Sequence, residues 1–336
     1  EIMKLLTTLT LGASLLIGTT AMAQDHIMRL SHGENDNNPT HVMAVKFEEL
    51  VEKYTDGRID VQIFGSNQLG SEQEVAQSVR TGSIEAEILY TGNLVPLAPS
   101  IGVMMLPYAF TSTQEAHAAM DALQDPLNER LPGEAGVRVL GYLEKGFRVL
   151  TNSEREVRNL DDLQGLKIRV SKNNIAIETF RSWGLDPIPM AWAEVFPALQ
   201  QGVIDGQENP YTTAVSMKFN EVQSYISEIH YLIWSGPLIV SERWYQGLDA
   251  DLQEALNRAG REAATFGRAN SASETKVAMK VLVEMGMTLS GAPEDEAKWQ
   301  EAARALWPSF AKEIGGEEWV TKAGSIIAEA TANLSN

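Results

Sequence analysis

The segment from Lys167 to Pro210 limits the fold of this 336-residue chain more than any other part of its sequence. Its apolar pattern and turn residues predict two strands that alternate with two helices: strands at 167–170 and 187–190, helices at 174–183 and 193–201. Such alternation is typical of an α/β layer with parallel strands. Because ligands of open α/β sheets bind at the carboxyl ends of the strands, a site in this segment is expected there.

The same alternation appears nearer the N-terminus, with strands predicted at 26–32, 59–64 and 84–90 and helices at 39–54 and 72–81. Ser71 and Glu74 have the spacing of a capping box, which predicts where the second of these helices begins. Two further strands are predicted at 137–142 and 147–151, where the chain could cross between two halves. A chain of this length exceeds one ordinary core, so the two α/β halves predict two lobes with a cleft between them.

A long helical tract at about 251–286 follows these two halves. A helix of this length in a two-lobed protein is expected to span both lobes, and Gly260 and Gly267 inside it would permit a bend. The alternative is two separate helices. A last helical tract is predicted at 295–331, broken at Gly315-Gly316.

The first 23 residues have the pattern of a secretory signal peptide. Lys4 supplies a positive charge, residues 5–17 form a short apolar run, and Ala21-Met22-Ala23 is a small-residue cleavage pattern. Export to the periplasm is therefore expected. No later segment has the roughly 20 apolar residues that a membrane-spanning helix needs, so we expect no membrane insertion.

The composition argues against several classes of function. The chain has no cysteine, which excludes disulfides, thiolate metal sites and cysteine nucleophiles, and its five histidines lack the spacing of zinc ligands. The net charge of −18 disfavours nucleic acid and anionic membranes as partners. The sequence contains no G-x-S-x-G, G-K-[ST] or G-x-G-x-x-G motif. We therefore predict a binding protein, not an enzyme, without metal or cofactor.

Two arginines are candidates for binding an anion. Arg169 lies in a short predicted strand between Ile168 and Val170, so its side chain points to the opposite face from both neighbours. It either lies on a solvated face or grips a carboxylate from the cleft with two hydrogen bonds. Arg148 lies near the start of another strand, and the local sequence favours an ordinary surface arginine there.

Four other residues allow both a structural and a binding role. Asn209 precedes Pro210 and suits a helix N-cap as well as a ligand contact. Trp192 lies between a strand and a helix, where it forms either core or the apolar wall of a site, and Trp234 has the same two alternatives. Glu72, close to Glu74, is most simply an acid that favours a helix N-terminus.

Taken together, four blocks of sequence resemble the DctP family of solute-binding proteins of TRAP (tripartite ATP-independent periplasmic) transporters. The resemblance covers nearly all of the chain after the signal peptide. The blocks are F-x-x-L-V-x-K-x-T-x-G-R at 47–58, Q-L-G-S-E at 68–72, G-L-K-I-R-V at 165–170, and the run from P-M-A-W-x-E-V to I-D-G-Q-E-N-P at 189–210.

The resemblance implies two α/β lobes, of the type II periplasmic-binding-protein kind, that close at a hinge on an organic acid, with the long helix across both. In this family, Arg169 matches the arginine that pairs with the ligand carboxylate, and Asn209 matches an asparagine that hydrogen-bonds the ligand. Arg148 matches a second arginine used by some members, Trp192 an aromatic against the ligand, and Glu72 an acidic pocket position. The family's partner is a TRAP membrane permease.

One loop departs from the family pattern. Relatives often carry His-Pro there, whereas this chain has Asn38-Pro39 at the end of an amide-rich stretch. The loop, and Asn38 in particular, is therefore a candidate for bonding ligand hydroxyls. Glu72 and Glu208 would repel a second ligand carboxylate unless Arg148 offsets them.

We therefore expect a hydroxylated monocarboxylate of the sugar-acid type. The alternatives are a dicarboxylate, a keto acid or an ectoine-type zwitterion, and, in other functional classes, an exported lyase or hydrolase with Glu72 or Glu208 as base, or a sensor subunit. The expected division of the chain is residues 26–146 and 235–270 in lobe I and residues 147–234 and 271–333 in lobe II.

Overall fold

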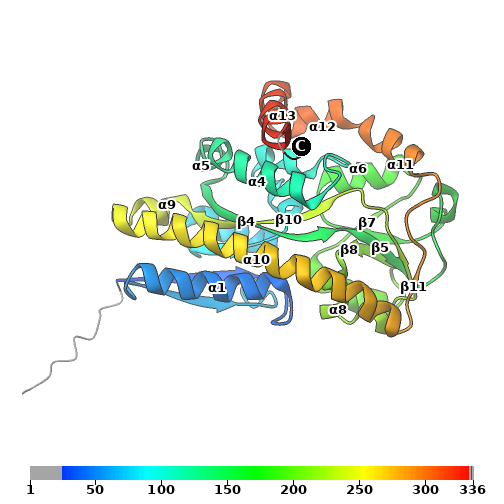
Figure 1. Cartoon of the computed structure of the whole chain (residues 1–336), viewed down its shortest axis with the longest axis horizontal. Coiled ribbons are helices and arrows are strands. Elements are labelled where there is room, and N and C mark those ends of the chain that lie inside the picture. The colour runs from blue at the N-terminus through cyan, green and yellow to red at the C-terminus, as the bar shows by residue number, and fades with distance from the viewer. Residues whose placement is uncertain (1–24, 333, 335–336) are drawn as a thin grey trace, which may run out of the picture.

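The computed structural model describes residues 25–332 and residue 334, and the predicted signal peptide lies outside this part of the chain. Two sheets and the helices around them form the molecule (Figure 1). The mixed α/β architecture with two lobes agrees with the predicted fold class. Among the described residues, no helix is both long enough and apolar enough to cross a membrane.

The first sheet has the strand order β2-β1-β3-β10-β4. The bounds are β1 (His26–His32), β2 (Ile59–Phe64), β3 (Ala86–Ile88), β4 (Val137–Phe147) and β10 (Ile233–Ser241). The three N-terminal strands run parallel, as predicted, with β1 between the other two. β10, which lies outside our sequence predictions, runs antiparallel to both β3 and β4, so the sheet is mixed.

The second sheet has the strand order β11-β9-β5-β8-β6-β7. The bounds are β5 (Val149–Asn152), β6 (Ile168–Val170), β7 (Ile188–Pro189), β8 (Gly206–Asn209), β9 (Tyr225–Ser227) and β11 (Thr288–Leu289). β6 is parallel to both β7 and β8, as the alternation of strands and helices predicts. β5 runs antiparallel to its neighbours β8 and β9.

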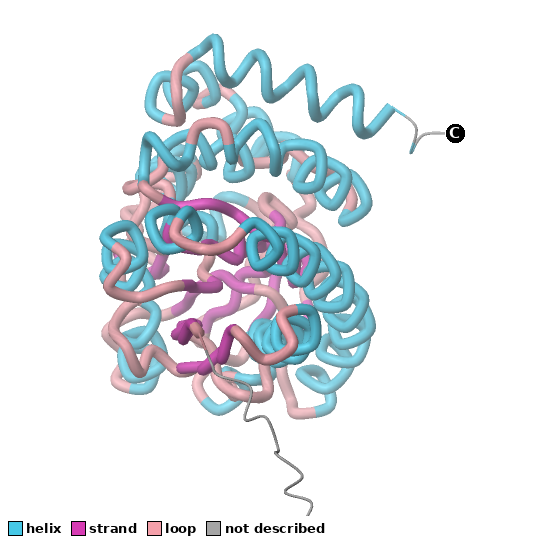
Figure 2. Tube along the Cα trace, turned by 90° about the vertical axis from the view of Figure 1, so that its left-hand side faces the viewer, coloured by secondary structure: helices cyan, strands magenta, loops and turns pink. Residues whose placement is uncertain are grey.

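The helices cover both sheets (Figure 2). Their bounds are α1 (Pro39–Tyr54), α2 (Glu72–Thr81), α3 (Thr91–Leu94), α4 (Thr113–Asn128), α5 (Leu131–Ala135), α6 (Asn174–Ser182), α7 (Trp192–Gln200), α8 (Tyr211–Ser216), α9 (Glu242–Gln246), α10 (Ala250–Glu284), α11 (Glu296–Arg304), α12 (Trp307–Glu313) and α13 (Glu317–Ala332). The capping box at Ser71 and Glu74 is present at the start of α2, as predicted.

α10 is one continuous helix of 35 residues, so the alternative of two separate helices is wrong. It packs against α1 and β4 beside the first sheet and against α8 beside the second, and it crosses the face of the molecule in Figure 1. A Cβ atom at Gly260 would lie 2.5 Å from the carbonyl oxygen of Leu140 on β4. This glycine therefore permits a close approach of helix and strand.

The C-terminal helices are broken at Gly315-Gly316, as predicted, and again between α11 and α12. α11 packs against α6, whereas α13 packs against α4 beside the first sheet. The lobe boundaries stated above stay a prediction.

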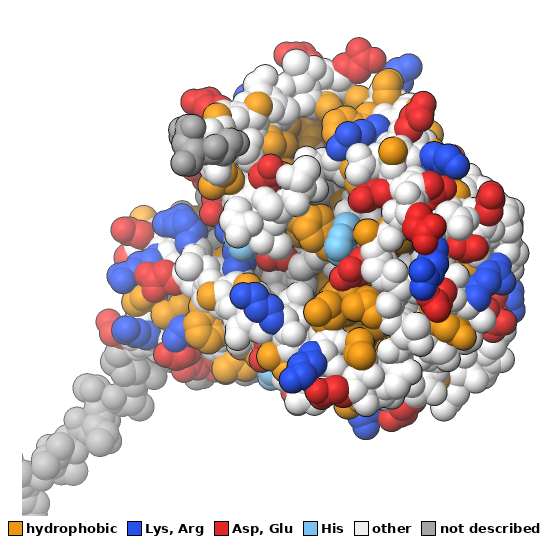
Figure 3. All heavy atoms as spheres, turned by 45° about the vertical axis from the view of Figure 1, so that its right-hand side comes forward, with side chains coloured by type: hydrophobic (Ala, Val, Ile, Leu, Met, Phe, Trp, Pro, Cys, Tyr) orange, Lys and Arg blue, Asp and Glu red, His pale blue; other side chains and the backbone are white. Residues whose placement is uncertain are grey.

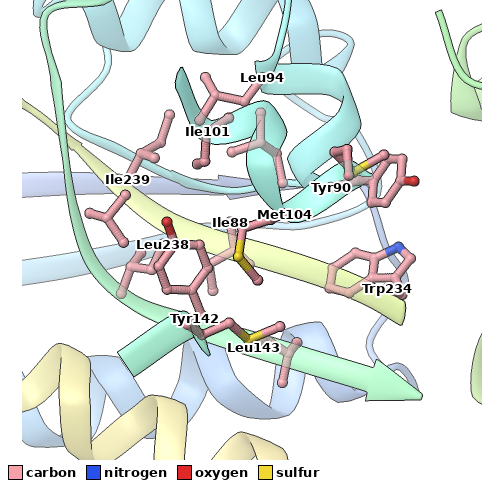
Figure 4. Packing of buried hydrophobic residues seen from close by; sticks show 14 of the residues in the cluster. Ile88, Tyr90, Leu94, Ile101, Met104, Tyr142, Leu143, Trp234, Leu238 and Ile239 are labelled. Carbon is pink, nitrogen blue, oxygen red and sulfur yellow. The ribbon is translucent and has the colours of Figure 1, made fainter. Parts of the chain in front are cut away.

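Two apolar clusters form the core. The larger surrounds the first sheet and continues under α6, and Figure 4 shows the part of it between β10, β4 and the segment that contains Leu94 and Met104. The smaller lies between the second sheet and α10, and its members include Val149, Ile226 and Leu282.

Candidate functional site

A cavity of about 290 Å³, partly open to solvent, lies between the two sheets, and most of its lining residues lie at or just after the carboxyl ends of strands. The first sheet and its helices supply Glu34, Glu72, Tyr90, Asn93 and Trp234, the second sheet and its flanking segments supply Arg169, Ser171, Trp192 and Asn209, and Arg148 lies between β4 and β5. Six of the eight residues that we predicted from the sequence therefore line one cavity, at the edge where open α/β sheets bind ligands.

Arg169 is a buried cation without a carboxylate partner in the described part of the chain. It lies in β6 with an exposed fraction of 3%. Its Nε and Nη2 both donate to the carbonyl oxygen of Met190, at 3.0 and 2.7 Å, and its guanidinium lies over the ring of Trp192. Burial lowers the pKa of Arg169 to about 10, which leaves it charged at neutral pH. An anion in the cavity would compensate this charge.

Arg148 is paired within the protein. Its Nη2 donates to Oε1 of Glu208 at 2.8 Å, its Nε donates to Oε2, and Tyr231 donates its hydroxyl to the same carboxylate at 2.9 Å. Burial would lower the pKa of Arg148, yet the adjacent Glu208 raises it above the usual value. Glu208 is fully buried behind Arg148 and does not line the cavity, whereas Nη1 of Arg148 has no hydrogen-bond partner among the described residues.

Lys145 and Glu34 form a second buried ion pair at the cavity wall. Lys145 Nζ lies 2.7 Å from Glu34 Oε1 and 3.9 Å from the centre of the Trp234 ring. It also donates to Oδ1 of Asn38 at 3.2 Å. Burial lowers the pKa of Lys145, which the charge of Glu34 opposes.

Asn38 does not line the cavity, contrary to what its loop suggested. Its Oδ1 caps α1 by accepting from the amide of Thr40 at 3.0 Å, and its Nδ2 donates to Oγ of Ser216 at 3.1 Å. Its hydrogen-bonding groups are thus engaged with the protein. Asn38 is fully buried and has a structural role, which the sequence alone did not distinguish from ligand binding.

Glu72 and Glu74 have different roles although they are two residues apart. Glu74 accepts from the amide and hydroxyl of Ser71, whereas Glu72 is buried and faces the cavity. Asn93 Nδ2 donates to Glu72 Oε2 at 2.5 Å, and the amide of Tyr90 donates to the same oxygen at 3.4 Å. Burial raises the pKa of Glu72 to about 7.

Asn209 lines the cavity from the end of β8, so the alternative of a helix N-cap is wrong. α8 begins at Tyr211, and Pro210 occupies the N-cap position. The pairing of β8 with β5 keeps Asn209 in the strand, and its Nδ2 donates to Oε1 of Gln207 at 2.7 Å.

Aromatic rings form the apolar walls. Trp192 begins α7, and Trp234 lies near the start of β10. Tyr90 and Trp234 are stacked with ring centres 5.8 Å apart, and Figure 4 shows them side by side at the edge of the core. The sequence did not decide whether Trp192 and Trp234 belong to the core or to the site, and both residues pack against the core and line the cavity.

Four wall residues were missed by the sequence analysis: Glu34, Tyr90, Asn93 and Ser171. Glu34, Tyr90 and Ser171 come just after the ends of β1, β3 and β6, so the rule that led to Arg169 would have found them. Asn93, on α3, gave no such signal.

Hydrogen bonds join the two lobes beside the cavity. Asn35, in the loop after β1, donates from Nδ2 to the carbonyl oxygen of Ser216 on α8 at 2.8 Å. Gln73 on α2 donates from Nε2 to the carbonyl oxygen of Lys172, after β6, at 3.1 Å. The structure is therefore that of a closed cleft.

The surface contrasts with the site. Acidic and basic side chains are interspersed over the face shown in Figure 3, whereas the cavity concentrates buried charges. Within residues 25–332, no cluster of three or more His, Asp or Glu side chains could hold a metal ion. The donor set is suited to an organic anion with several polar groups.

Residues 30–313 match the model of the DctP family, described as bacterial extracellular solute-binding protein, family 7. The chain belongs to this family. The predicted family and fold are thereby confirmed. Because the members of the family are solute-binding receptors, the prediction that the chain is not an enzyme is confirmed as well.

Three similar proteins are informative. The 2,3-diketo-L-gulonate-binding periplasmic protein of Escherichia coli K12 is 31% identical over 82% of this chain and 84% of its own. A TRAP periplasmic solute-binding protein of Rhodobacter sphaeroides, solved in an apo, open and partially disordered form, is 66% identical with a TM-score of 0.79, over 91% of this chain and 100% of its own. The sugar-acid-binding protein of Advenella mimigardefordensis in complex with galactonate is 32% identical with a TM-score of 0.85, over 90% of this chain and 98% of its own.

Structural similarity does not follow sequence identity among these proteins. This chain superposes better on the galactonate complex, at 32% identity, than on the open apo form, at 66% identity. The difference agrees with the closed cleft that the hydrogen bonds of Asn35 and Gln73 indicate.

Proposed function

We propose that this chain is the periplasmic receptor of a TRAP transporter that binds a hydroxylated monocarboxylate of the sugar-acid type and delivers it to a membrane permease. One observation carries the proposal: Arg169 is a charged guanidinium, 3% exposed, at the cavity between the lobes, and no described carboxylate is paired with it. The ligand carboxylate would take this place.

Binding and closure are coupled in this proposal. A charge-assisted hydrogen bond contributes about 1.5–3 kcal/mol, and a buried guanidinium without an anion is costly. Closure around Arg169 is therefore favoured when an anion fills the cavity. The ligand shifts the balance between open and closed forms only through its stronger binding to the closed form.

The remaining wall suits a polyhydroxylated carbon chain. Asn93, Asn209 and Ser171 would hydrogen-bond hydroxyl groups, while Trp192 and Trp234 would contact the carbon skeleton. The similar proteins support this class, because one is named for a diketo sugar acid and another holds galactonate.

The test is titration calorimetry with D-galactonate, 2,3-diketo-L-gulonate and succinate, for the wild type and Arg169→Ala. The variant is expected to lose at least a hundredfold in affinity for its sugar acid, about 2.7 kcal/mol. Arg181→Ala is the matched control, because Arg181 is exposed on α6 and paired with Glu178. Equal affinities of the wild type and Arg169→Ala would contradict the proposal.

A dicarboxylate is the second candidate, and one observation favours it. Nη1 of Arg148 is a buried donor without a partner in the described part of the protein, and it would donate a hydrogen bond to a second carboxylate. Binding of succinate more tightly than every sugar acid in the same titrations would support this alternative. Delivery is tested by reconstituting transport with the permease.

A further inference from the structure

The carboxyl group of Glu72 has no cation partner in the described part of the chain. Both of its hydrogen bonds, from Asn93 and from the amide of Tyr90, go to Oε2. Oε1 accepts no hydrogen bond from residues 25–332, and Glu72 lines the cavity. A buried carboxyl group in these surroundings is more stable with a proton than without one.

A second buried carboxyl group lies behind Glu72. Glu87 on β3 has an exposed fraction of 1%, and neither of its oxygens has a hydrogen-bond partner among the described residues. The negative charge of Glu72 is one of the two causes that raise the pKa of Glu87, after burial. Two such groups cannot both carry a negative charge at low cost.

The other charges around the cavity leave one positive charge uncompensated. Lys145 is paired with Glu34, and Arg148 with Glu208, so each pair is neutral. Arg169 has no carboxylate partner among the described residues. With the Glu72 carboxyl protonated, the wall has a net charge of about +1, which matches a ligand with one negative charge.

Other elements that pack on α2 do not change this balance. β10 has no titratable side chain in its sequence IWSGPLIVS, and Glu242 at the start of α9 is paired with Arg138. Of the charged groups nearest to Glu72, Glu34 favours the protonated form, whereas Lys145 opposes it.

We propose that Glu72 is protonated in the closed complex and donates a hydrogen bond from Oε1 to a hydroxyl or keto oxygen of the ligand. The receptor then takes up about one proton with each monoanion at pH values well above the pKa of Glu72 in the unliganded protein. This inference rests on the proposed function and narrows it, because it selects ligands with one carboxylate and a neutral acceptor oxygen.

A zwitterionic ligand makes the opposite prediction. Its cation would face an ionised Glu72, which also balances the charges of the wall. Such binding would weaken as the pH falls, because protonation of Glu72 would remove the partner of the cation. The pH dependence therefore distinguishes the two arrangements.

The direction of the pH dependence of ligand affinity follows from the linkage between proton binding and ligand binding. Sugar acids ionise near about pH 4, so their charge is constant at neutral pH. A bound monoanion raises the pKa of Glu72 above its value of about 7 in the empty cavity. Opening of the cleft in the unliganded receptor reduces the burial that raises this pKa, so affinity falls by up to about tenfold for each pH unit above the pKa of Glu72 in the open form.

The experiment is calorimetric titration of the full chain with D-galactonate between pH 6 and pH 8.5, and at pH 8 in phosphate and in Tris. The wild type is expected to lose at least about tenfold in affinity over this range. It is also expected to take up about one proton at pH 8, measured from the different heats in the two buffers.

Glu72→Gln keeps the shape of the side chain and a permanent donor. Its affinity is expected to change less than about twofold over the same range, without proton uptake. Glu74→Gln is the matched control on the same helix, because Glu74 contacts Ser71 outside the cavity, and it should retain the pH dependence of the wild type.

The outcomes separate the two proposals. Binding of D-galactonate with a pH-independent affinity, or with an affinity that rises with pH, would overturn the role of Glu72 and leave the receptor function standing. Failure of every sugar acid tested to bind would overturn the proposed function and this inference with it.

Discussion

Gly260 lies where α10 crosses β4, and its replacement by alanine tests how closely the long helix is held to the first sheet. A Cβ atom there would lie 2.5 Å from the carbonyl oxygen of Leu140, 2.6 Å from its Cβ and 2.8 Å from its carbonyl carbon. Two of these atoms belong to the backbone of β4, which is held by its pairing with β10, so they cannot rotate away.

Two effects of opposite sign decide the result. Alanine is about 1 kcal/mol more favourable than glycine inside a helix. Overpacking a close contact costs about 1–3 kcal/mol in the free energy of unfolding. Because the contacted backbone of Leu140 is rigid, the cost of Gly260→Ala is expected near the upper end of this range. We therefore expect a net loss of about 2 kcal/mol in the free energy of unfolding.

The assay is urea unfolding followed by far-UV circular dichroism. The matched control is Gly324→Ala in α13, where no atom lies within 4 Å of the added Cβ. The control is expected to gain up to about 1 kcal/mol, since only the helix preference acts there. A Gly260→Ala protein as stable as the wild type would refute the close packing of α10 on β4.

Two further perturbations test the closed cleft and the buried charges. Asn35→Ala removes the hydrogen bond to the carbonyl oxygen of Ser216 between the lobes. Affinity for the ligand, measured by calorimetry, is expected to fall about three- to tenfold, because one such bond contributes about 0.5–1.5 kcal/mol to closure. An unchanged affinity would show that closure does not depend on this bond. Glu208→Gln leaves Arg148 buried without its counter-charge and is expected to cost about 3–5 kcal/mol in urea unfolding. Glu178→Gln, at an exposed ion pair, should cost less than about 1 kcal/mol, and equal losses in the two variants would contradict this reasoning.

The candidate site shows where sequence reasoning reached its limit. Arg169 was correctly placed opposite its apolar neighbours, because the side-chain period of a strand is two. Its local sequence did not decide between solvent and cleft, and only the resemblance to a family favoured the cleft. The local sequence of Glu72 indicated only an acid at a helix N-terminus, and the resemblance to a family made it a pocket position. Glu72 and Glu74 both lie in the first turn of α2, but only Glu72 faces the cavity, since residues two apart in a helix point in different directions.

The sequence by itself determined many local elements of this protein: the alternating strands and helices within residues 26–90 and 167–201, the capping box at Ser71 and the long helix α10. These elements follow from periodicities and end signals that are written in neighbouring residues. The tertiary structure alone decided that β10 joins the first sheet and that Asn209 ends a strand. It alone paired Lys145 with Glu34, 111 positions away, because burial and ion pairing depend on residues that only folding brings together.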